Sequence, residues 1–489
     1  MSDDNKKNPE DAPTKKPLLY RDHNPTSRRE FMAQGFLGAT AFALAPQLLL
    51  NSKNAQAAGA ACAQASSGGM TPVIVIDLAG GGHIPGSNVM VGGAGGQMNF
   101  LQSYTSLGIN ANEHPSLNNQ LNQDMGLAFH QSSGILQGIK DVASMQTQLQ
   151  MEGTIFATIS NDDTANNQHN PMYWLNKAGA KGSLVQLAGT QNSTSGGRSD
   201  APLDSVNPTV APVKLSSRND ALNLVSLGTL SSTFSNSQVD QILKRSANVS
   251  TGRVNRMPAR SIPDAIKDII SCGFSGTSDQ VKQFSPTVVD PNNDTTMTTI
   301  FNKVTDAGNR NAALPITKLV LDGLIGAGTI VLGGYDYHNN TRTTGDAMDR
   351  ELGQVIGAIV ESAAAKNKDV VVYVLTDGGV GTNGNPDPNN GRPVWTGDNG
   401  NRSSTFMLVY KKDGRPAMRS QRRQVGHFKA DGSVDPNAAL TSNSVVNTAK
   451  AMVANYLALH GMEGQLEKVV TDDPFRLQLD YYLMFDKLR

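Results

Sequence analysis

The chain has 489 residues, with 42 Lys and Arg against 42 Asp and Glu, 38% hydrophobic residues and two cysteines. This length suits one large α/β domain or two ordinary ones, because length sets only a soft limit on the number of domains. The zero formal net charge argues against a nucleic-acid-binding protein, which would carry a basic excess on one face. Two cysteines cannot build a disulfide-rich scaffold.

Residues 1–57 have the pattern of an export signal. A polar leader ends in Ser27-Arg28-Arg29-Glu30-Phe31, a weakly apolar stretch follows over 36–50, and Ala55-Gln56-Ala57 supplies a cleavage site. The pair Arg28 and Arg29 is typical of a signal that the twin-arginine export machinery reads. The apolar stretch is shorter than the ~20 residues that a membrane-spanning helix needs. The sequence predicts a periplasmic protein that is not an integral membrane protein after cleavage; a chance Arg-Arg pair ahead of a short buried helix is the alternative.

The mature chain is expected to begin with a flexible segment over 58–70, which contains Cys62. A disulfide between Cys62 and Cys272 is permitted in an oxidising compartment, and two free thiols are the alternative. A lipid anchor on Cys62 is disfavoured, because Gly59 stands where a lipoprotein signal prefers an aliphatic residue.

Residues 71–489 show alternating strand and helix patterns. The predicted strands are, in chain order, Val73–Ile76, Thr154–Ile159, Thr329–Leu332, Asp369–Leu375 and Phe406–Tyr410. The predicted helices are a segment with Ile135, Ile139, Val142 and Met145 on one face, then Ile316–Leu324, Asp346–Ala365 and Val445–Leu459. This alternation predicts a single α/β domain with a doubly wound, mostly parallel sheet that helices cover on both faces.

A small insert is expected around residues 190–300. The stretches 189–217 and 275–298 are rich in Gly, Ser, Thr, Asn and Pro, which is typical of long surface excursions. Weak helices are predicted between them, at Val239–Ala247 and Ile262–Ser271.

Three of the strands end in a carboxylate: Asp77, Asp336 and Asp377. The carboxyl ends of parallel strands meet at one edge of a sheet, so these side chains could converge on a hard divalent cation. In Asp336-x-His338 an extended backbone would point both side chains the same way, as a shared metal requires. The alternative is that each aspartate accepts backbone N–H groups as a cap of the next helix or turn.

These motifs resemble an uncharacterised family of twin-arginine-exported, alkaline-phosphatase-like (sulfatase-like) proteins, of which this chain would be a divergent member. The resemblance rests on Leu78-Ala79-Gly80-Gly81-Gly82 with Asn88 beyond, on Gly333-Gly334-Tyr335-Asp336-Tyr337-His338, and on Thr376-Asp377-Gly378-Gly379. It implies a doubly wound α/β core, one or two metal ions held by Asp77, Asp336, His338 and Asp377, and a hydroxyl nucleophile that attacks phosphate or sulfate esters. Ser87, or a nearby hydroxyl in the loop after Asp77, would be that catalytic group.

Two departures weaken the implied chemistry. Relatives have Ser-Glu-Phe-Gly-Arg where this chain has Thr376-Asp377-Gly378-Gly379-Val380, and Asp-His-Gly where it has Asp398-Asn399-Gly400. An arginine and an imidazole are therefore missing, and an oxygen-rich ligand set favours Mg²⁺, Ca²⁺ or Mn²⁺ over Zn²⁺. His83, His169, Asp398 and Asn399 are possible additional ligands, although the favoured alternative is that both histidines lie at the surface.

Two functions stay open on the sequence. One is an exported protein with a degenerate site, which serves binding or assembly in the cell envelope without catalysis. The other is a metal-dependent hydrolase of phosphate or sulfate esters. Fold does not decide between them, because unrelated functions share one scaffold.

Overall fold

The computed structural model describes residues 69–161, 168–225, 286–336, 340 and 342–489, with five single positions between 238 and 252. The predicted signal with Arg28 and Arg29, both cysteines, His338 and the predicted helix Ile262–Ser271 lie outside the described residues. Of the predicted helix Val239–Ala247, two positions, 241 and 245, are described.

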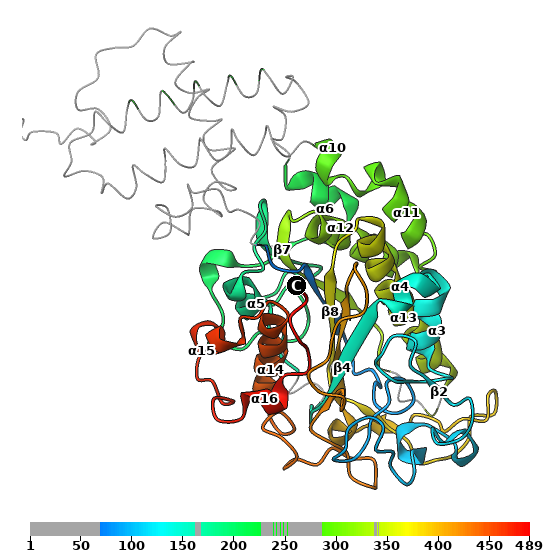
Figure 1. The fold of residues 1–489 in the computed structure, drawn as a ribbon. Coiled ribbons are helices and arrows are strands. Elements are labelled where there is room, and N and C mark those ends of the chain that lie inside the picture. Colours follow the sequence, from blue (N-terminus) through cyan, green and yellow to red (C-terminus); the bar gives the residue numbers. More distant parts are fainter. Residues whose placement is uncertain are drawn as a thin grey trace, which may run out of the picture.

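The centre of the molecule is an eight-stranded sheet in the order β12-β4-β11-β8-β1-β7-β5-β6 (Figure 1). Its strands are β1 (Val73–Leu78), β4 (Met151–Ala157), β5 (Val185–Gly189), β6 (Val213–Lys214), β7 (Ile325–Leu332), β8 (Val370–Thr376), β11 (Ser404–Tyr410) and β12 (Gln424–Val425). Within this sheet β11 runs antiparallel to both of its neighbours, and the other pairs are parallel. The predicted mostly parallel sheet is confirmed.

Helices cover the sheet on both faces, as predicted (Figure 1). One face carries α3 (Gly134–Val142), α4 (Met145–Leu149), α11 (Thr295–Phe301), α12 (Ala307–Leu321) and α13 (Thr343–Ala365). The other carries α5 (Met172–Ala178), α14 (Val445–Ala458), α15 (Leu466–Val469) and α16 (Leu479–Tyr482). Two cores result, because alternate residues of a strand point to opposite faces. In β1, for example, Ile74 and Ile76 belong to the first core, and Val73 and Val75 to the second.

The described residues also form four shorter strands and two further α-helices. They are β2 (Leu121–Asn122), β3 (Phe129–His130), β9 (Val380–Gly381), β10 (Gly397–Asp398), α6 (Arg218–Asn223) and α10 (Pro286–Val289). No helix of the described residues is long and apolar enough to cross a membrane.

The segment with Ile135 to Met145 forms two helices, and the prediction of a single helix is wrong. α3 ends at Val142, and the Ser144 side chain accepts a hydrogen bond from the Thr147 backbone N–H and so caps the start of α4. Serine favours this cap over a helix interior, because its hydroxyl replaces a missing backbone acceptor. Met145 consequently leaves the buried face and is 55% exposed.

The stretch 189–217 has many exposed residues, as its composition suggests, but part of it packs against the sheet. β6 extends the sheet beside β5, and Ser195, Gly196, Gly197 and Ser199 are buried. The residues that bury this segment come from β1 and β7, far away in the sequence, so its local composition carries no sign of the contact. This segment covers the sheet near the carboxyl end of β1.

α3 and α13 pack through glycines. A Cβ atom on Gly138 would lie 2.0 Å from the carbonyl oxygen of Arg350, and one on Gly353 would lie 2.1 Å from that of Ile135. No real side chain tolerates such distances, so the two helices approach this closely because both positions lack a side chain. The contact fixes where the first turns of α13 meet the loop after β1.

Candidate functional site

The carboxyl ends of β1, β7 and β8 lie at one edge of the sheet, as the sequence predicts. β1 pairs in parallel with both neighbours, and Leu78 is in register with Leu332 of β7 and with Thr376 of β8. The loops that follow these strands therefore start side by side. In open α/β sheets this is the edge where ligands bind, and it is the candidate functional site of this protein.

Asp77 lies within β1, one residue before its end, and is completely buried on the face that carries α5 and α14. Its Oδ2 accepts hydrogen bonds from the backbone N–H groups of Arg198 (2.7 Å) and Ser199 (2.8 Å), and its Oδ1 accepts one from the Ser199 hydroxyl (2.8 Å). Burial raises the pKa of Asp77 above its ordinary value, although these hydrogen bonds act to lower it. The carboxylate thus anchors the segment 195–199. It accepts backbone N–H groups, as in the capping alternative, but these belong to a loop far away in the sequence and not to the next helix or turn.

Gly197 completes this anchor. A Cβ atom on it would lie 2.3 Å from Asp77 Oδ2 and 3.0 Å from a methyl group of Thr329 in β7. The chain can pass over the Asp77 carboxylate at this point because residue 197 has no side chain. The segment 195–199 therefore covers Asp77 closely.

Asp336 and Asp377 lie on either side of the glycine-rich loop after β1. A Cβ atom on Gly80 would be 3.0 Å from Asp336 Cβ, and one on Gly81 would be 2.6 Å from the Asp377 carbonyl oxygen. Both glycines have a positive φ, +109° and +90°, which side chains disfavour. Asp336 is exposed and Asp377 is partly buried. The glycine pair thus draws together the chain segments that carry two of the predicted metal ligands.

The third segment at this edge is the ribbon of β9 and β10, which follows β8. Asp398 pairs with Val380 across the ribbon and is exposed, and the Asn399 backbone N–H donates to the Gly379 carbonyl oxygen at 2.6 Å. Asn399 itself is partly buried. Asp377, Asp398 and Asn399 are therefore held within one compact unit at the end of β8.

Arg402 is a residue of this unit that the sequence analysis missed. A Cβ atom on Gly381 would lie 3.1 Å from its Nη1, and its Nε is buried with no hydrogen-bond partner among the described residues. Burial lowers the pKa of Arg402, and Asp431 raises it in opposition. The sequence signal was available, since Arg402 lies two residues after Asn399-Gly400, but the family resemblance directs attention to an arginine at the position of Val380. The structure supplies a cation from the short 3-10 helix Gly400–Arg402, which follows β10.

Ser87, the predicted nucleophile, is in the loop after β1 and is 3% exposed. Its Oγ is buried and has no hydrogen-bond partner among the described residues. The next residue fixes the loop: Asn88 Nδ2 donates to Asp349 Oδ2 of α13 (2.7 Å) and to the His83 carbonyl oxygen (2.8 Å), and its Oδ1 accepts from Ser133 Oγ (2.7 Å). Ser87 is thus held below the surface by the residue that follows it.

His83 is completely buried, so the alternative of a surface histidine is wrong for this residue. Its ring centroid is 4.2 Å from that of Trp395, and the Arg342 guanidinium lies 4.5 Å from the Trp395 ring centroid. Burial, reinforced by the positive charge of Arg342, lowers the pKa of His83 to about 3. His83 is therefore a neutral packing residue at physiological pH.

His169 is partly buried on the same side of the edge as Asp77. Its neighbours hold it there: Gln168 Oε1 accepts from the Thr376 backbone N–H (3.0 Å), and Asn170 Nδ2 donates to Thr329 Oγ1 (2.9 Å). Its Nδ1 is buried with no hydrogen-bond partner among the described residues. Burial lowers the pKa of His169, while Asp200 and Asp204 raise it in opposition. These neighbours hold the segment 168–170 beside Thr376 at the end of β8 and beside Thr329 in β7; a metal-binding role of His169 stays a prediction.

Within the described ranges, no group of three or more His, Cys, Asp or Glu side chains is arranged to hold a metal ion. His338, one of the four predicted ligands, lies outside those ranges. The shared divalent cation stays a prediction.

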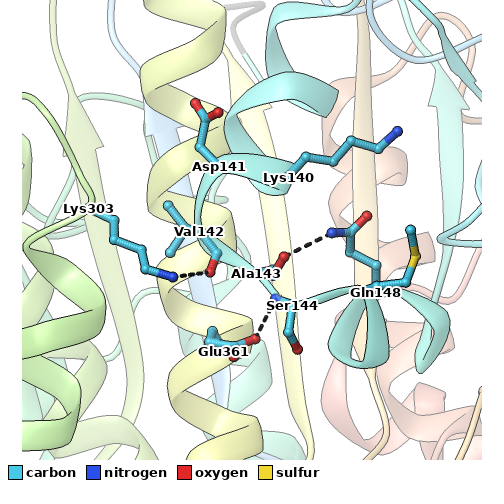
Figure 2. Close-up of a pocket in the computed structure, with 9 residues that line it drawn as sticks. Lys140, Asp141, Val142, Ala143, Ser144, Gln148, Lys303 and Glu361 are labelled. Atoms are coloured by element: carbon cyan, nitrogen blue, oxygen red, sulfur yellow. Dashed lines mark hydrogen bonds between the residues drawn. The ribbon is translucent and has the colours of Figure 1, made fainter.

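A pocket of about 490 Å³ lies elsewhere, at the C-terminal end of α3 (Figure 2). Its charged side chains complete the corner between α3 and α4: Lys303 Nζ donates to the Val142 carbonyl oxygen (3.2 Å), and Glu361 Oε2 accepts from the Ser144 backbone N–H (2.9 Å). None of the predicted site residues lines this pocket. The side chains that line it stabilise the corner between α3 and α4, and the pocket is not part of the candidate site.

Comparison with protein-family models, with curated proteins and with solved structures gives no match. The likeness to alkaline-phosphatase-like proteins therefore rests on the sequence motifs. What supports a function is the geometry of the sheet edge.

Proposed function

We propose that this chain is an exported α/β protein of the alkaline-phosphatase-like type whose site is degenerate, and that it serves binding or assembly in the cell envelope without catalysis. The observation that carries the proposal is the environment of Asp77. Its Oδ2 accepts hydrogen bonds from the backbone N–H groups of Arg198 and Ser199, its Oδ1 accepts one from the Ser199 hydroxyl, and the side chain is 0% exposed. A metal ligand needs a lone pair directed at the ion, and here protein donors surround the carboxylate.

The position of Ser87 supports the same proposal. A nucleophile must reach the substrate and needs a base or a metal to activate its hydroxyl. Ser87 is 3% exposed, and its buried Oγ has no hydrogen-bond partner among the described residues. An attack by this hydroxyl would require the loop after β1 to move, although Asn88 ties it to α13 at 2.7 Å.

A metal-dependent hydrolase of phosphate or sulfate esters is the second candidate. The arrangement after β8 favours it, because Asp377, Asp398 and Asn399 lie in one unit with the half-buried Arg402. These oxygen ligands would hold Mg²⁺, Ca²⁺ or Mn²⁺ better than Zn²⁺, and the guanidinium could hold an anionic group. Ser87 would be the catalytic residue on this reading.

Metal content and its effect on stability separate the two candidates. The purified exported chain is dialysed against Mg²⁺, Ca²⁺ or Mn²⁺, its bound metal is measured by mass spectrometry, and its Tm is recorded with and without EDTA. The proposal expects far less than one ion per chain and an unchanged Tm. One ion per chain together with a Tm that EDTA lowers would contradict it, since carboxylates left without their ion repel one another.

Two variants test where such an ion would bind. Asp377→Asn removes a carboxylate of the candidate site, and Asp413→Asn removes an exposed carboxylate just beyond β11 as a matched control. If Asp377→Asn alone abolishes metal binding and the EDTA effect, the hydrolase candidate replaces the proposal. If the variants behave alike, the metal site is not at this edge.

A further inference from the structure

A second pocket, of about 440 Å³, lies between the segment 436–443 and the chain around α16. The first of these segments is anchored at the end of β4: Thr158 Oγ1 donates to the Thr441 carbonyl oxygen (2.9 Å), and the Ile159 backbone N–H donates to that of Ser442 (2.8 Å). β4 and β8 point the same way, because β11 is antiparallel to both. This pocket therefore adjoins the same carboxyl edge, and its volume is in the range of small-molecule sites, ~300–1,000 Å³.

The lining of this pocket carries no charge. Its nine residues are one proline, two alanines, one leucine, two tyrosines and three residues with amide side chains. Three of them, Asn437, Asn443 and Gln478, are exposed, and their amide groups make no hydrogen bond to another described residue. Each amide offers both a donor and an acceptor. The pocket thus presents three neutral groups of mixed hydrogen-bonding capacity.

The wall around these amides is fixed by other hydrogen bonds. The Tyr481 hydroxyl donates to the Ala438 carbonyl oxygen (3.3 Å), and the Leu440 backbone N–H donates to the Tyr482 hydroxyl (2.9 Å). The Arg422 guanidinium lies 4.2 Å from the Tyr481 ring centroid and holds that ring in place. A wall that is rigid before binding costs little conformational entropy when a ligand arrives.

We propose that this pocket binds a neutral carbohydrate. A sugar hydroxyl is both a donor and an acceptor, so it matches an amide in either direction. The partly buried ring of Tyr481 offers apolar surface to the C–H groups of a sugar ring, and Leu440, 41% exposed, adds to it. No charged side chain lines the pocket, so a charged ligand would lose hydration here without a counter-charge in the lining. This inference goes beyond the proposed function and is independent of the metal question, because none of the predicted metal ligands lines the pocket.

The test uses saturation-transfer NMR on the full chain with chitotriose, maltotriose and cellotriose as neutral probes. Trigalacturonate serves as a charged comparison, and acetyl-trialanine-amide as a neutral peptide comparison. We expect at least one neutral trisaccharide to bind, with Asn437→Ala and Gln478→Ala each weakening binding about tenfold. Gln146→Ala, which removes an exposed amide from α4, is the matched control and should leave binding unchanged. All three variants alter exposed side chains, and circular dichroism verifies their folding.

Four results would overturn the inference. One is no transfer from any neutral trisaccharide at about 10 mM, well above the affinity expected of a preformed sugar site. Another is binding that Asn437→Ala and Gln478→Ala leave unchanged, which would place the sugar elsewhere. Equal or tighter binding of trigalacturonate would refute the neutral ligand, and tighter binding of the peptide would make this a peptide site. Loss of metal binding at Asp377 would bear on the proposed function alone.

Discussion

Asp77→Asn should be tolerated where Asp77→Ala is not, if Asp77 anchors the segment 195–199. Asparagine can place its carbonyl oxygen where Oδ2 now accepts the N–H groups of Arg198 and Ser199, at 2.7 and 2.8 Å. Its amide can then donate to the Ser199 hydroxyl, which turns from donor to acceptor. Every partner stays satisfied, so we expect a loss of about 1 kcal/mol in the free energy of unfolding.

Alanine leaves those partners without an acceptor. An unsatisfied buried donor costs roughly 1–3 kcal/mol, and two backbone N–H groups with a hydroxyl lose their acceptor together. Arg198 is exposed and can recover part of this loss from water, whereas Ser199 is buried. We therefore expect Asp77→Ala to cost about 3 to 5 kcal/mol, including the small cavity that the missing carboxylate leaves.

Urea unfolding followed by circular dichroism measures both variants, with the slope m compared to verify that the folding behaviour is unchanged. The reasoning fails if the two variants lose the same stability. It fails differently if Asp77→Asn keeps its stability but loses a bound divalent ion that the natural protein carries. In that case Asp77 is a metal ligand and the proposed function loses its main support.

Three further outcomes are expected. Gly138→Ala should lower the free energy of unfolding in urea by about 3 kcal/mol, because the new Cβ would lie 2.0 Å from the Arg350 carbonyl oxygen of α13. A net loss below about 1 kcal/mol, after the gain in helix propensity from alanine, would contradict this packing. His460 Nε2 accepts the Thr71 backbone N–H at 2.9 Å, and burial lowers the pKa of His460. The neutral His460 therefore contributes stability that is present above the unfolded pKa of about 6.5 and is lost as the pH falls through the folded pKa. The urea midpoint should fall between pH 7 and 5, and His460→Gln should reduce that fall; an identical pH profile would refute the assignment. Replacing Arg28 and Arg29 by lysine should stop export and leave a folded cytoplasmic protein, and full processing of this variant in the periplasm would rule out the twin-arginine signal.

The predictable part of this fold is the part whose signal is local. The β-branched runs of β1 and β8 and the periodic apolar positions of α13 identify those elements, because a strand buried on both faces and a helix packed on one have distinct patterns. Parallel pairing then brings their carboxyl ends to one edge, so the position of the candidate site followed from the order of the elements.

The role of each side chain at that edge came from contacts between distant segments. Asp77 is buried and hydrogen-bonded because residues 198 and 199 fold over it, more than a hundred positions along the chain. Arg402 approaches Gly381 because β9 and β10 pair, and the neutral pocket forms because 436–443 meets α16. An aspartate at a strand end has the same sequence pattern whether it holds an ion or a loop. Its function depends on which donors surround it, and tertiary packing decides that.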